Sequence, residues 1–277
     1  MPVALAWALS VSLAWPPQFA AGVTLVEVYA TVSARAGAAT SLQAGDFVVS
    51  DEGRAVDLVA FSAGDFPLSV AVAIDRSWSM AGERLAMARA AAHTFLGELR
   101  PEDEAMLISV GSEVEVLAPL SRDRPAQHEA VTRLEPWGTT RLRDAMQQAL
   151  GALGEARGRR ALVVLSDGED RESSVSQSVL RERARQAGIL LYPIALGRKM
   201  PAWLDELASL TGGRARLVGS ARQLTPAFRE IAEELRRQYL LGFVLPADAP
   251  RGTWRRLTVR VLRPGFTVRA RQGYVVP

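Results

Sequence analysis

The chain has 277 residues, of which 48% are hydrophobic and 23% charged, a balance that is ordinary for a globular protein with a buried core. It contains no cysteine and two histidines, which excludes disulfide bridges, thiolate metal sites, a cysteine nucleophile and a zinc site built from several histidines. The net charge of +3 conceals an uneven distribution, because the segment from Arg236 onwards carries nine arginines and one acidic residue. That basic segment indicates either an anionic partner or a solvated strand face.

The first 21 residues contain no charged side chain and begin with an apolar run. The run up to Ala14 is too short to cross a membrane but has the length of the apolar region of a signal peptide. Small-residue cleavage sites end at Ala14 and at Ala20, although no positively charged segment precedes the run. We expect residues 1–21 to be a signal peptide and the protein to be exported, with a buried first strand as the alternative. No other apolar run is long enough for a membrane span.

Predicted strands and helices alternate through residues 66–237. The predicted strands are Leu68–Ile74, Ala105–Val110, Glu113–Leu117, Ala161–Leu165, Ile189–Ala195 and Ala215–Val218. The predicted helices are Glu83–Leu99, Pro125–Leu134, Leu142–Leu153, Glu172–Ala187 and two short helices that begin at Pro201 and Leu224. Near-continuous apolar strands are typical of parallel strands that are buried on both faces. The alternation therefore predicts an α/β fold with a doubly wound, mostly parallel sheet.

The two ends of the chain show strands without helices between them. In residues 22–65, Thr24–Val32 alternates apolar and polar residues, and Asp46–Asp51 with Val56–Phe61 predicts a hairpin around Glu52 and Gly53. In residues 238–277, the predicted strands are Gln238–Leu245, Arg256–Leu262 and Phe266–Arg271. We expect these two segments to pair into one small antiparallel β-domain, with the α/β domain of residues 66–237 inserted between them.

Three polar clusters follow the predicted strands at positions where α/β proteins bind their ligands. Asp75, Ser77 and Ser79 follow the first strand, Asp167 follows the fourth, and Thr139 and Thr140 precede the helix that begins at Leu142. Two carboxylates at one sheet edge repel each other, and a cation removes that conflict. Oxygen donors without nitrogen or sulfur select Mg²⁺, Mn²⁺ or Ca²⁺ over zinc or copper.

These clusters resemble the metal-ion-dependent adhesion site of von Willebrand factor type A (VWA) domains, in order and spacing, from Pro67 to about Arg237. The resemblance implies a Rossmann-like fold and one divalent cation, with Mg²⁺ expected first. It implies hydroxyl ligands from Ser77, Ser79 and a threonine, and carboxylates from Asp75 and Asp167. Flanking motifs, among them Gly45–Val49 and the ending from Arg263 to Tyr274, resemble a bacterial, often acidobacterial, group of secreted VWA-related proteins.

The threonine ligand is ambiguous. Aligning Asp144 with the usual helix start of the family gives Thr140, whereas counting from Gly138 gives Thr139. We take Thr140 as the expected ligand. Two positions depart from the family pattern, because Trp78 stands where glycine is usual and Arg76 where a small or neutral residue is usual.

The expected function is that of an exported binding module in which the metal completes its coordination with a Glu or Asp carboxylate of a partner protein. One alternative is a structural scaffold whose VWA metal site is vestigial. The other is a Mg²⁺-dependent hydrolase, which is disfavoured because there is no Gly-rich phosphate loop and Lys199 is the only lysine. Catalysis is not expected. Nucleic-acid binding is not expected either, since the basic strands lack interleaved aromatic residues on which bases could stack. The oligomeric state stays open.

Overall fold

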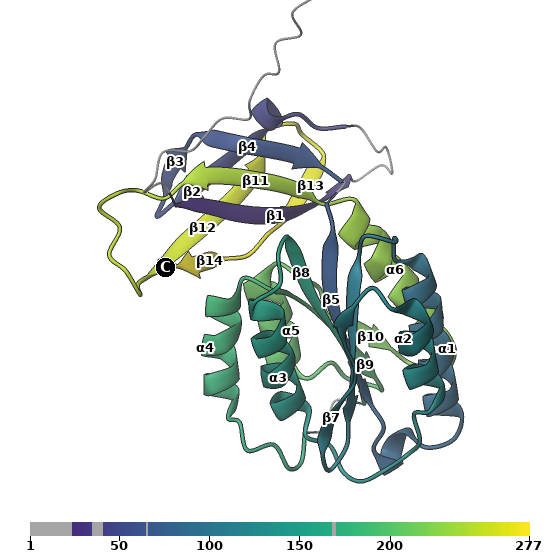
Figure 1. Ribbon diagram of the computed structural model, residues 1–277. Coiled ribbons are helices and arrows are strands. Elements are labelled where there is room, and N and C mark those ends of the chain that lie inside the picture. The colour runs from purple at the N-terminus through teal and green to yellow at the C-terminus, as the bar shows by residue number, and fades with distance from the viewer. Residues whose placement is uncertain (1–23, 35–40, 65, 168–169) are drawn as a thin grey trace, which may run out of the picture.

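The computed structural model describes residues 24–34, 41–64, 66–167 and 170–277. The proposed signal peptide of residues 1–21 lies outside this described part. Figure 1 shows an α/β unit with an all-β unit at one of its ends, and the all-β unit takes strands from both ends of the chain. No helix in the described part of the chain is long and apolar enough to cross a membrane.

The α/β unit is built on a six-stranded sheet with the order β10-β9-β8-β5-β6-β7. Its strands are β5 (Leu68–Asp75), β6 (Glu104–Val110), β7 (Val114–Ser121), β8 (Arg159–Ser166), β9 (Leu190–Leu196) and β10 (Arg216–Val218). All neighbours pair in parallel except β6 and β7, which form an antiparallel edge. The predicted doubly wound, mostly parallel sheet is therefore confirmed.

Helices cover both faces of this sheet (Figure 1). They are α1 (Glu83–Glu98), α2 (Arg124–Thr132) and α6 (Leu224–Arg236) on one face, and α3 (Leu142–Gly154), α4 (Gln177–Ala187) and α5 (Ala202–Thr211) on the other. Each face has its own apolar core, centred on Phe95 and Phe228 on the first face and on Met146 and Leu162 on the second. Gly188 ends α4 in the left-handed conformation, with a φ of 61°.

The all-β unit consists of two four-stranded sheets, with the orders β13-β1-β11-β4 and β14-β12-β2-β3. Its strands are β1 (Leu25–Ala34), β2 (Phe47–Asp51), β3 (Arg54–Val56), β4 (Leu58–Ala63), β11 (Tyr239–Val244), β12 (Trp254–Val261), β13 (Phe266–Arg269) and β14 (Gly273–Val275). Strand β1 pairs with β11 and β13, and β2 pairs with β12, all antiparallel. An apolar core that includes Val28, Phe47, Leu241 and Phe243 lies between the sheets. The predicted pairing of the two terminal segments is confirmed.

Several predicted elements were wrong in extent; the strand Glu113–Leu117, for example, runs as β7 to Ser121. The predicted strand Val56–Phe61 is divided at Asp57, so that β3 pairs with β2 while β4 crosses to β11 in the other sheet. The predicted helix Glu172–Ala187 begins only at Gln177, because Asp144 accepts hydrogen bonds from the backbone N–H groups of Ser174 and Val175 at 3.1 and 2.9 Å. Those bonds hold the preceding segment in a loop, and the Ser176 hydroxyl caps the helix.

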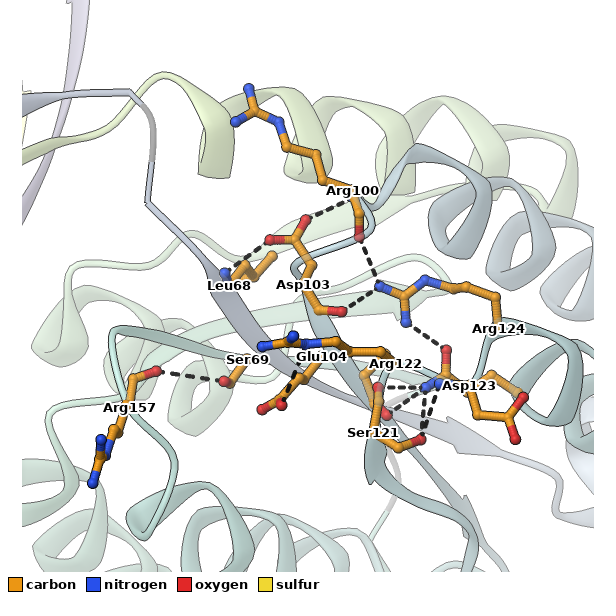
Figure 2. A network of polar contacts seen from close by, with 12 residues as sticks. Leu68, Ser69, Arg100, Asp103, Glu104, Ser121, Arg122, Asp123, Arg124 and Arg157 are labelled. Carbon is orange, nitrogen blue, oxygen red and sulfur yellow. Dashed lines mark hydrogen bonds and ion pairs between the residues drawn. The ribbon is translucent and has the colours of Figure 1, made fainter.

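A network of polar contacts joins the amino ends of the parallel strands (Figure 2). The buried carboxylate of Asp103 accepts from the backbone N–H groups of Leu68 at 2.9 Å and Arg100 at 2.8 Å. The Arg124 guanidinium donates to the carbonyl oxygens of Asp103 at 2.6 Å and Arg100 at 3.2 Å. The start of β5, the turn before β6 and the start of α2 are thereby held together at the end of the sheet that faces the all-β unit.

We expect Asp103→Ala to lower the free energy of unfolding by about 3 kcal/mol, because two backbone N–H groups lose their acceptor, each worth about 1–3 kcal/mol when buried. Urea unfolding followed by circular dichroism measures this loss. Asp123→Ala is the matched control, since the Asp123 carboxylate caps the exposed start of α2 through Ala126 N at 3.0 Å. That control is expected to lose about 1 kcal/mol. Equal losses in the two variants would contradict the role of the Asp103 network.

Candidate metal site at the carboxyl edge of the sheet

The loops that follow β5 and β8 meet at the end of the α/β unit away from the all-β unit (Figure 1). Backbone hydrogen bonds join the loop after β5 to the loop before α3, from Trp78 N to Gly138 O at 3.0 Å and from Trp137 N to Arg76 O at 2.7 Å. The loop after β8 is joined to the same segment, because Arg171 N donates to Thr140 O at 3.1 Å. The three polar clusters that were predicted to converge do meet at one edge.

Asp75 is the most deeply buried member of the cluster, with 0% of its surface exposed. One carboxylate oxygen, Oδ1, accepts from Ser77 N at 2.9 Å, and the other, Oδ2, accepts from Ser166 Oγ at 2.6 Å. Burial raises the pKa of Asp75 to about 6, and the nearby charge of Asp167 adds to this rise while the hydrogen bonds from Ser166 and Ser77 oppose it. The site therefore holds a carboxylate whose negative charge is poorly compensated by its surroundings.

Asp167 presents a buried acceptor without a partner. Its Oδ1 atom is buried and accepts no hydrogen bond within the described part of the chain. Its Oδ2 atom lies 4.0 Å from Nη1 of Arg84, which also donates to the Ser79 carbonyl oxygen at 3.1 Å. A buried acceptor is rarely left unpaired, so this oxygen indicates a place for a cation or an ordered water.

The hydroxyl groups of Ser77 and Ser79 lie side by side, with 3.0 Å between their Oγ atoms. Ser77 is buried and precedes the short 3₁₀ turn Trp78–Met80, in which Met80 N donates to Ser77 O at 2.8 Å. This turn brings the two hydroxyls together directly after the end of β5. Met80 itself is fully buried in the core.

The two threonines differ in what their hydroxyl groups contact. Thr139 Oγ1 lies 3.2 Å from Ser112 Oγ, and Thr139 N donates to the same oxygen at 2.9 Å. The Thr139 hydroxyl is thus engaged with the loop after β6. Thr140 is 3% exposed, and its backbone carbonyl is bound to the loop that contains Asp167. This arrangement favours Thr140 as the threonine that faces the two aspartates.

The two residues that depart from the family pattern, Arg76 and Trp78, lie in the loop after β5, and this loop is joined to Trp137. Trp78 is 64% exposed, and Trp137 is 39% exposed. The guanidinium of Arg76 lies over the Trp137 ring, 5.3 Å from its centre, and its Nη2 atom is 3.5 Å from Glu115 Oε2. Arg76 is therefore turned towards Trp137 and Glu115, and Glu115 balances part of its positive charge.

Sequence reasoning missed several residues that build this edge. Ser166 donates to Asp75, Ser112 holds Thr139, and Arg84 approaches Asp167. Ser166 carried a usable signal, since it is the last residue of a buried strand beside β5. Asp170 holds the loop against α3 by accepting from Arg143 N at 2.7 Å.

The two histidines of the chain lie away from this edge and contact each other. The Nδ1 atoms of His93 on α1 and His128 on α2 are 2.7 Å apart, and the rings stack with their centres 5.0 Å apart. Burial lowers the pKa of His93, and the charges of His128 and Arg89 lower it further. His93 and His128 thus pair α1 with α2.

The oxygen atoms at the edge suit a hard divalent cation. They comprise two carboxylates and the hydroxyls of Ser77, Ser79 and Thr140, which is the oxygen chemistry that Mg²⁺, Mn²⁺ and Ca²⁺ prefer. The described residues form no cluster of three His, Cys, Asp or Glu side chains. The site at this edge has only two carboxylates, and its other oxygens come from three hydroxyl groups. The observations that indicate a fit for a cation here are the unpartnered Asp167 oxygen and the raised pKa of Asp75.

Comparisons with known proteins agree with this fold. A family model described as the von Willebrand factor type A domain matches residues 70–169. Inter-alpha-trypsin inhibitor heavy chain H4 of Sus scrofa is 29% identical over 206 residues, which cover 66% of this chain and 22% of that protein. The matched segment thus spans about a fifth of that relative.

Two solved structures share the fold. The von Willebrand factor type A protein from Catenulispora acidiphila superposes with a TM-score of 0.57 at 15% identity, covering 93% of this chain and 75% of that chain. The vWF domain of the type V pili tip protein Mfa5 from Porphyromonas gingivalis gives a TM-score of 0.53 at 14% identity, covering 60% of this chain and 94% of that one. The α/β unit described above therefore has the fold of a von Willebrand factor type A domain, and residues 70–169 within it match the family model of that domain.

Proposed function

We propose that this protein is an exported binding module that recognises an acidic group of a partner protein through one divalent cation at the carboxyl edge of its VWA domain. The observation that carries the proposal is the buried, unpartnered Oδ1 atom of Asp167 beside the poorly compensated carboxylate of Asp75. Asp75, Ser77, Ser79, Thr140 and Asp167 would hold the cation, with Mg²⁺ the first candidate and Mn²⁺ or Ca²⁺ the others. Bound there, the cation would offer a coordination position to a carboxylate.

The rim of the edge supports a role in protein binding. Exposed tryptophans are enriched among residues that contribute most to binding energy at interfaces. Trp78 projects from the loop that supplies Ser77 and Ser79, and Trp137 precedes the loop that supplies Thr140. A partner whose carboxylate reaches the site would contact one or both indole rings. We therefore expect the partner to present its Glu or Asp next to an apolar or aromatic side chain.

Export is supported by the uncharged, apolar character of residues 1–21. One structural neighbour is a pilus tip protein, and it resembles this chain in fold alone. The narrower resemblance to secreted bacterial VWA-related proteins stays a prediction.

A second candidate is a structural scaffold in which the metal site is vestigial. The position of Arg84 favours it, because this guanidinium approaches Asp167 Oδ2 and binds the Ser79 carbonyl oxygen, so that it already supplies a positive charge beside the two aspartates. In this case the carboxylates would be balanced by Arg84, and the cation would bind weakly.

Calorimetry distinguishes the metal-dependent binding module from the scaffold. Mg²⁺ and Mn²⁺ are titrated into the wild type, Thr140→Val and Thr139→Val. We expect Thr140→Val to weaken Mg²⁺ binding at least tenfold and Thr139→Val to leave it nearly unchanged, since the Thr139 hydroxyl binds Ser112. A wild type that binds neither metal would support the scaffold. The partner is then sought by pull-down from the exported proteins of the source organism in Mg²⁺ and in EDTA. Equal capture in both would show that the metal is not the recognition element.

A further inference from the structure

A cleft of about 250 Å³ lies where the all-β unit meets the VWA domain, far from the metal edge. Its walls come from both units: Glu27 and Tyr29 on β1, Arg160 on β8, and Arg271 with Tyr274 near the end of the chain. Strand β14 lies against α4 at this junction (Figure 1). The cleft is thus a place where a bound molecule would touch both parts of the protein.

Two guanidinium groups converge in this cleft. Arg271 Nη1 and Arg160 Nη2 lie 3.3 and 3.5 Å from the point that a Cβ atom on Gly188 would occupy. Arg160 is held by its other nitrogen, Nη1, which donates to the Gly154 carbonyl oxygen at 3.1 Å at the end of α3. Because Gly188 has no side chain, the two guanidiniums reach the same small volume from opposite units.

The position of Arg271 is fixed by its backbone. Gln272 N donates to the Leu210 carbonyl oxygen at 3.1 Å, and a Cβ atom on Gly212 would lie 2.5 Å from Arg271 N. The backbone at Arg271 is therefore packed closely against the end of α5. The guanidinium lies over the Tyr274 ring, 5.6 Å from its centre.

The positive charge in the cleft is only partly balanced by the nearby carboxylate of Glu27. Among the described residues, no carboxylate forms an ion pair with Arg160 or Arg271, and the buried Nε atom of Arg271 has no acceptor. The acidic side chain in the lining, Glu27, accepts from the Tyr29 hydroxyl at 3.3 Å. Burial lowers the pKa of Arg271 to about 10, the charge of Arg160 lowers it further, and Tyr274, Glu27 and Tyr29 oppose this fall. Two like charges packed without a carboxylate bound between them are costly unless an anion joins them.

We propose that this cleft binds a phosphate group, which bridges Arg160 of the VWA domain and Arg271 of the all-β unit. Guanidinium groups present paired N–H donors that match the oxygens of phosphate, and two of them can neutralise its double charge. The size of the cleft suits a free phosphate ion or a small phosphate monoester. The proposal is independent of the metal site, since none of its residues belongs to that edge.

Isothermal titration of the full chain with inorganic phosphate, against chloride at equal ionic strength, tests the proposal. We expect saturable binding by the wild type, and at least tenfold weaker binding by Arg271→Gln and by Arg160→Gln. Arg260→Gln is the matched control, because Arg260 is an exposed arginine of the same basic segment. A parallel titration with glycerol phosphate separates a free ion from a monoester, and sulfate tests whether the site distinguishes phosphate from other tetrahedral anions.

Each outcome bears on the proposal. No phosphate-specific heat with the wild type would overturn it, as would an equal loss of affinity in Arg260→Gln, which would indicate general attraction to the basic segment. Thermal unfolding checks the folding of the variants, and phosphate is expected to raise the Tm of the wild type and of Arg260→Gln alone. If Arg271→Gln fails to fold, Arg160→Gln decides, because Arg160 lies at the start of β8 and its removal leaves the docked backbone of Arg271 in place.

Discussion

In Asp75→Asn, added Mg²⁺ is expected to leave the stability of the protein unchanged, whereas in the wild type it raises the free energy of unfolding. At 100 times the dissociation constant, a ligand that binds only the folded state adds about 2.7 kcal/mol. The asparagine side chain keeps the shape of Asp75 but removes one of the two negative charges that would hold the cation. Urea unfolding at pH 7.5, with and without Mg²⁺, measures the difference.

Without metal, Asp75→Asn is expected to be more stable than the wild type at pH 7.5, by about 1–3 kcal/mol. The pKa of Asp75 rises from 3.8 in the unfolded chain to about 6 in the folded protein. The free energy of unfolding of the wild type is therefore highest, with respect to Asp75, below about pH 4, where this residue is protonated. That contribution is lost as the pH rises through about 6. The variant lacks this dependence. Asp205→Asn, in the exposed first turn of α5, is the control and should behave as the wild type. Equal Mg²⁺ stabilisation of Asp75→Asn and wild type would remove Asp75 from the site.

Replacing Gly138 with alanine is expected to lower the free energy of unfolding by about 3 kcal/mol and to weaken Mg²⁺ binding at least tenfold, although Gly138 supplies no side chain. Its φ is +75°, and a Cβ atom there would lie 2.7 Å from Ser112 N and 2.8 Å from Ser112 Cβ. The backbone conformation costs an alanine about 1–2 kcal/mol, and forced overpacking adds about 1–3 kcal/mol. The loop would have to shift, and Thr140 would shift with it.

Gly252→Ala separates the two causes. Gly252 has a φ of +71°, but nothing lies within 4 Å of its would-be Cβ atom. This control carries the backbone strain without the collision and is expected to lose about 1 kcal/mol and no Mg²⁺ affinity. Denaturant unfolding and metal titration of the two variants give the comparison. Similar losses in both would mean that contact with Ser112 does not set the position of the threonine loop.

The sequence predicted the architecture well where burial dominates. Strands such as Leu68–Asp75 are apolar on both faces, so their place in a parallel sheet follows from composition alone. The positions of Asp75 and Asp167 at strand ends then brought them to one edge. The pairing of β1 with β11 followed from the alternation of β1 and from the lack of helices between the terminal strands, although Leu241, Gly242 and Phe243 of β11 are all buried.

The errors arose where a distant side chain decides local structure. Residues 172–176 read as the start of a helix, but the Asp144 carboxylate, 30 residues away from Ser174, binds their backbone instead. The choice between Thr139 and Thr140 depends on Ser112, which no spacing rule connects to the threonine loop. Arg84 was overlooked because its approach to Asp167 depends on how α1 is placed against the edge. Such contacts join segments whose separation in sequence carries no periodic signal.

The insertion of the VWA domain between the halves of the all-β unit sets the order in which the chain can fold during synthesis. Strand β1 pairs with residues 239–244, so Leu25 cannot pair until Val244 has been synthesised. In the same way, Phe47 cannot pair until Val261 has been synthesised. All strands of the VWA sheet lie within residues 68–218, so they are synthesised before residues 239–261 leave the ribosome. Strands β1 to β4 therefore leave the ribosome with unsatisfied edges and an apolar face. A folded VWA domain brings the two ends of its own chain near each other, which shortens the loop that the late strands must close.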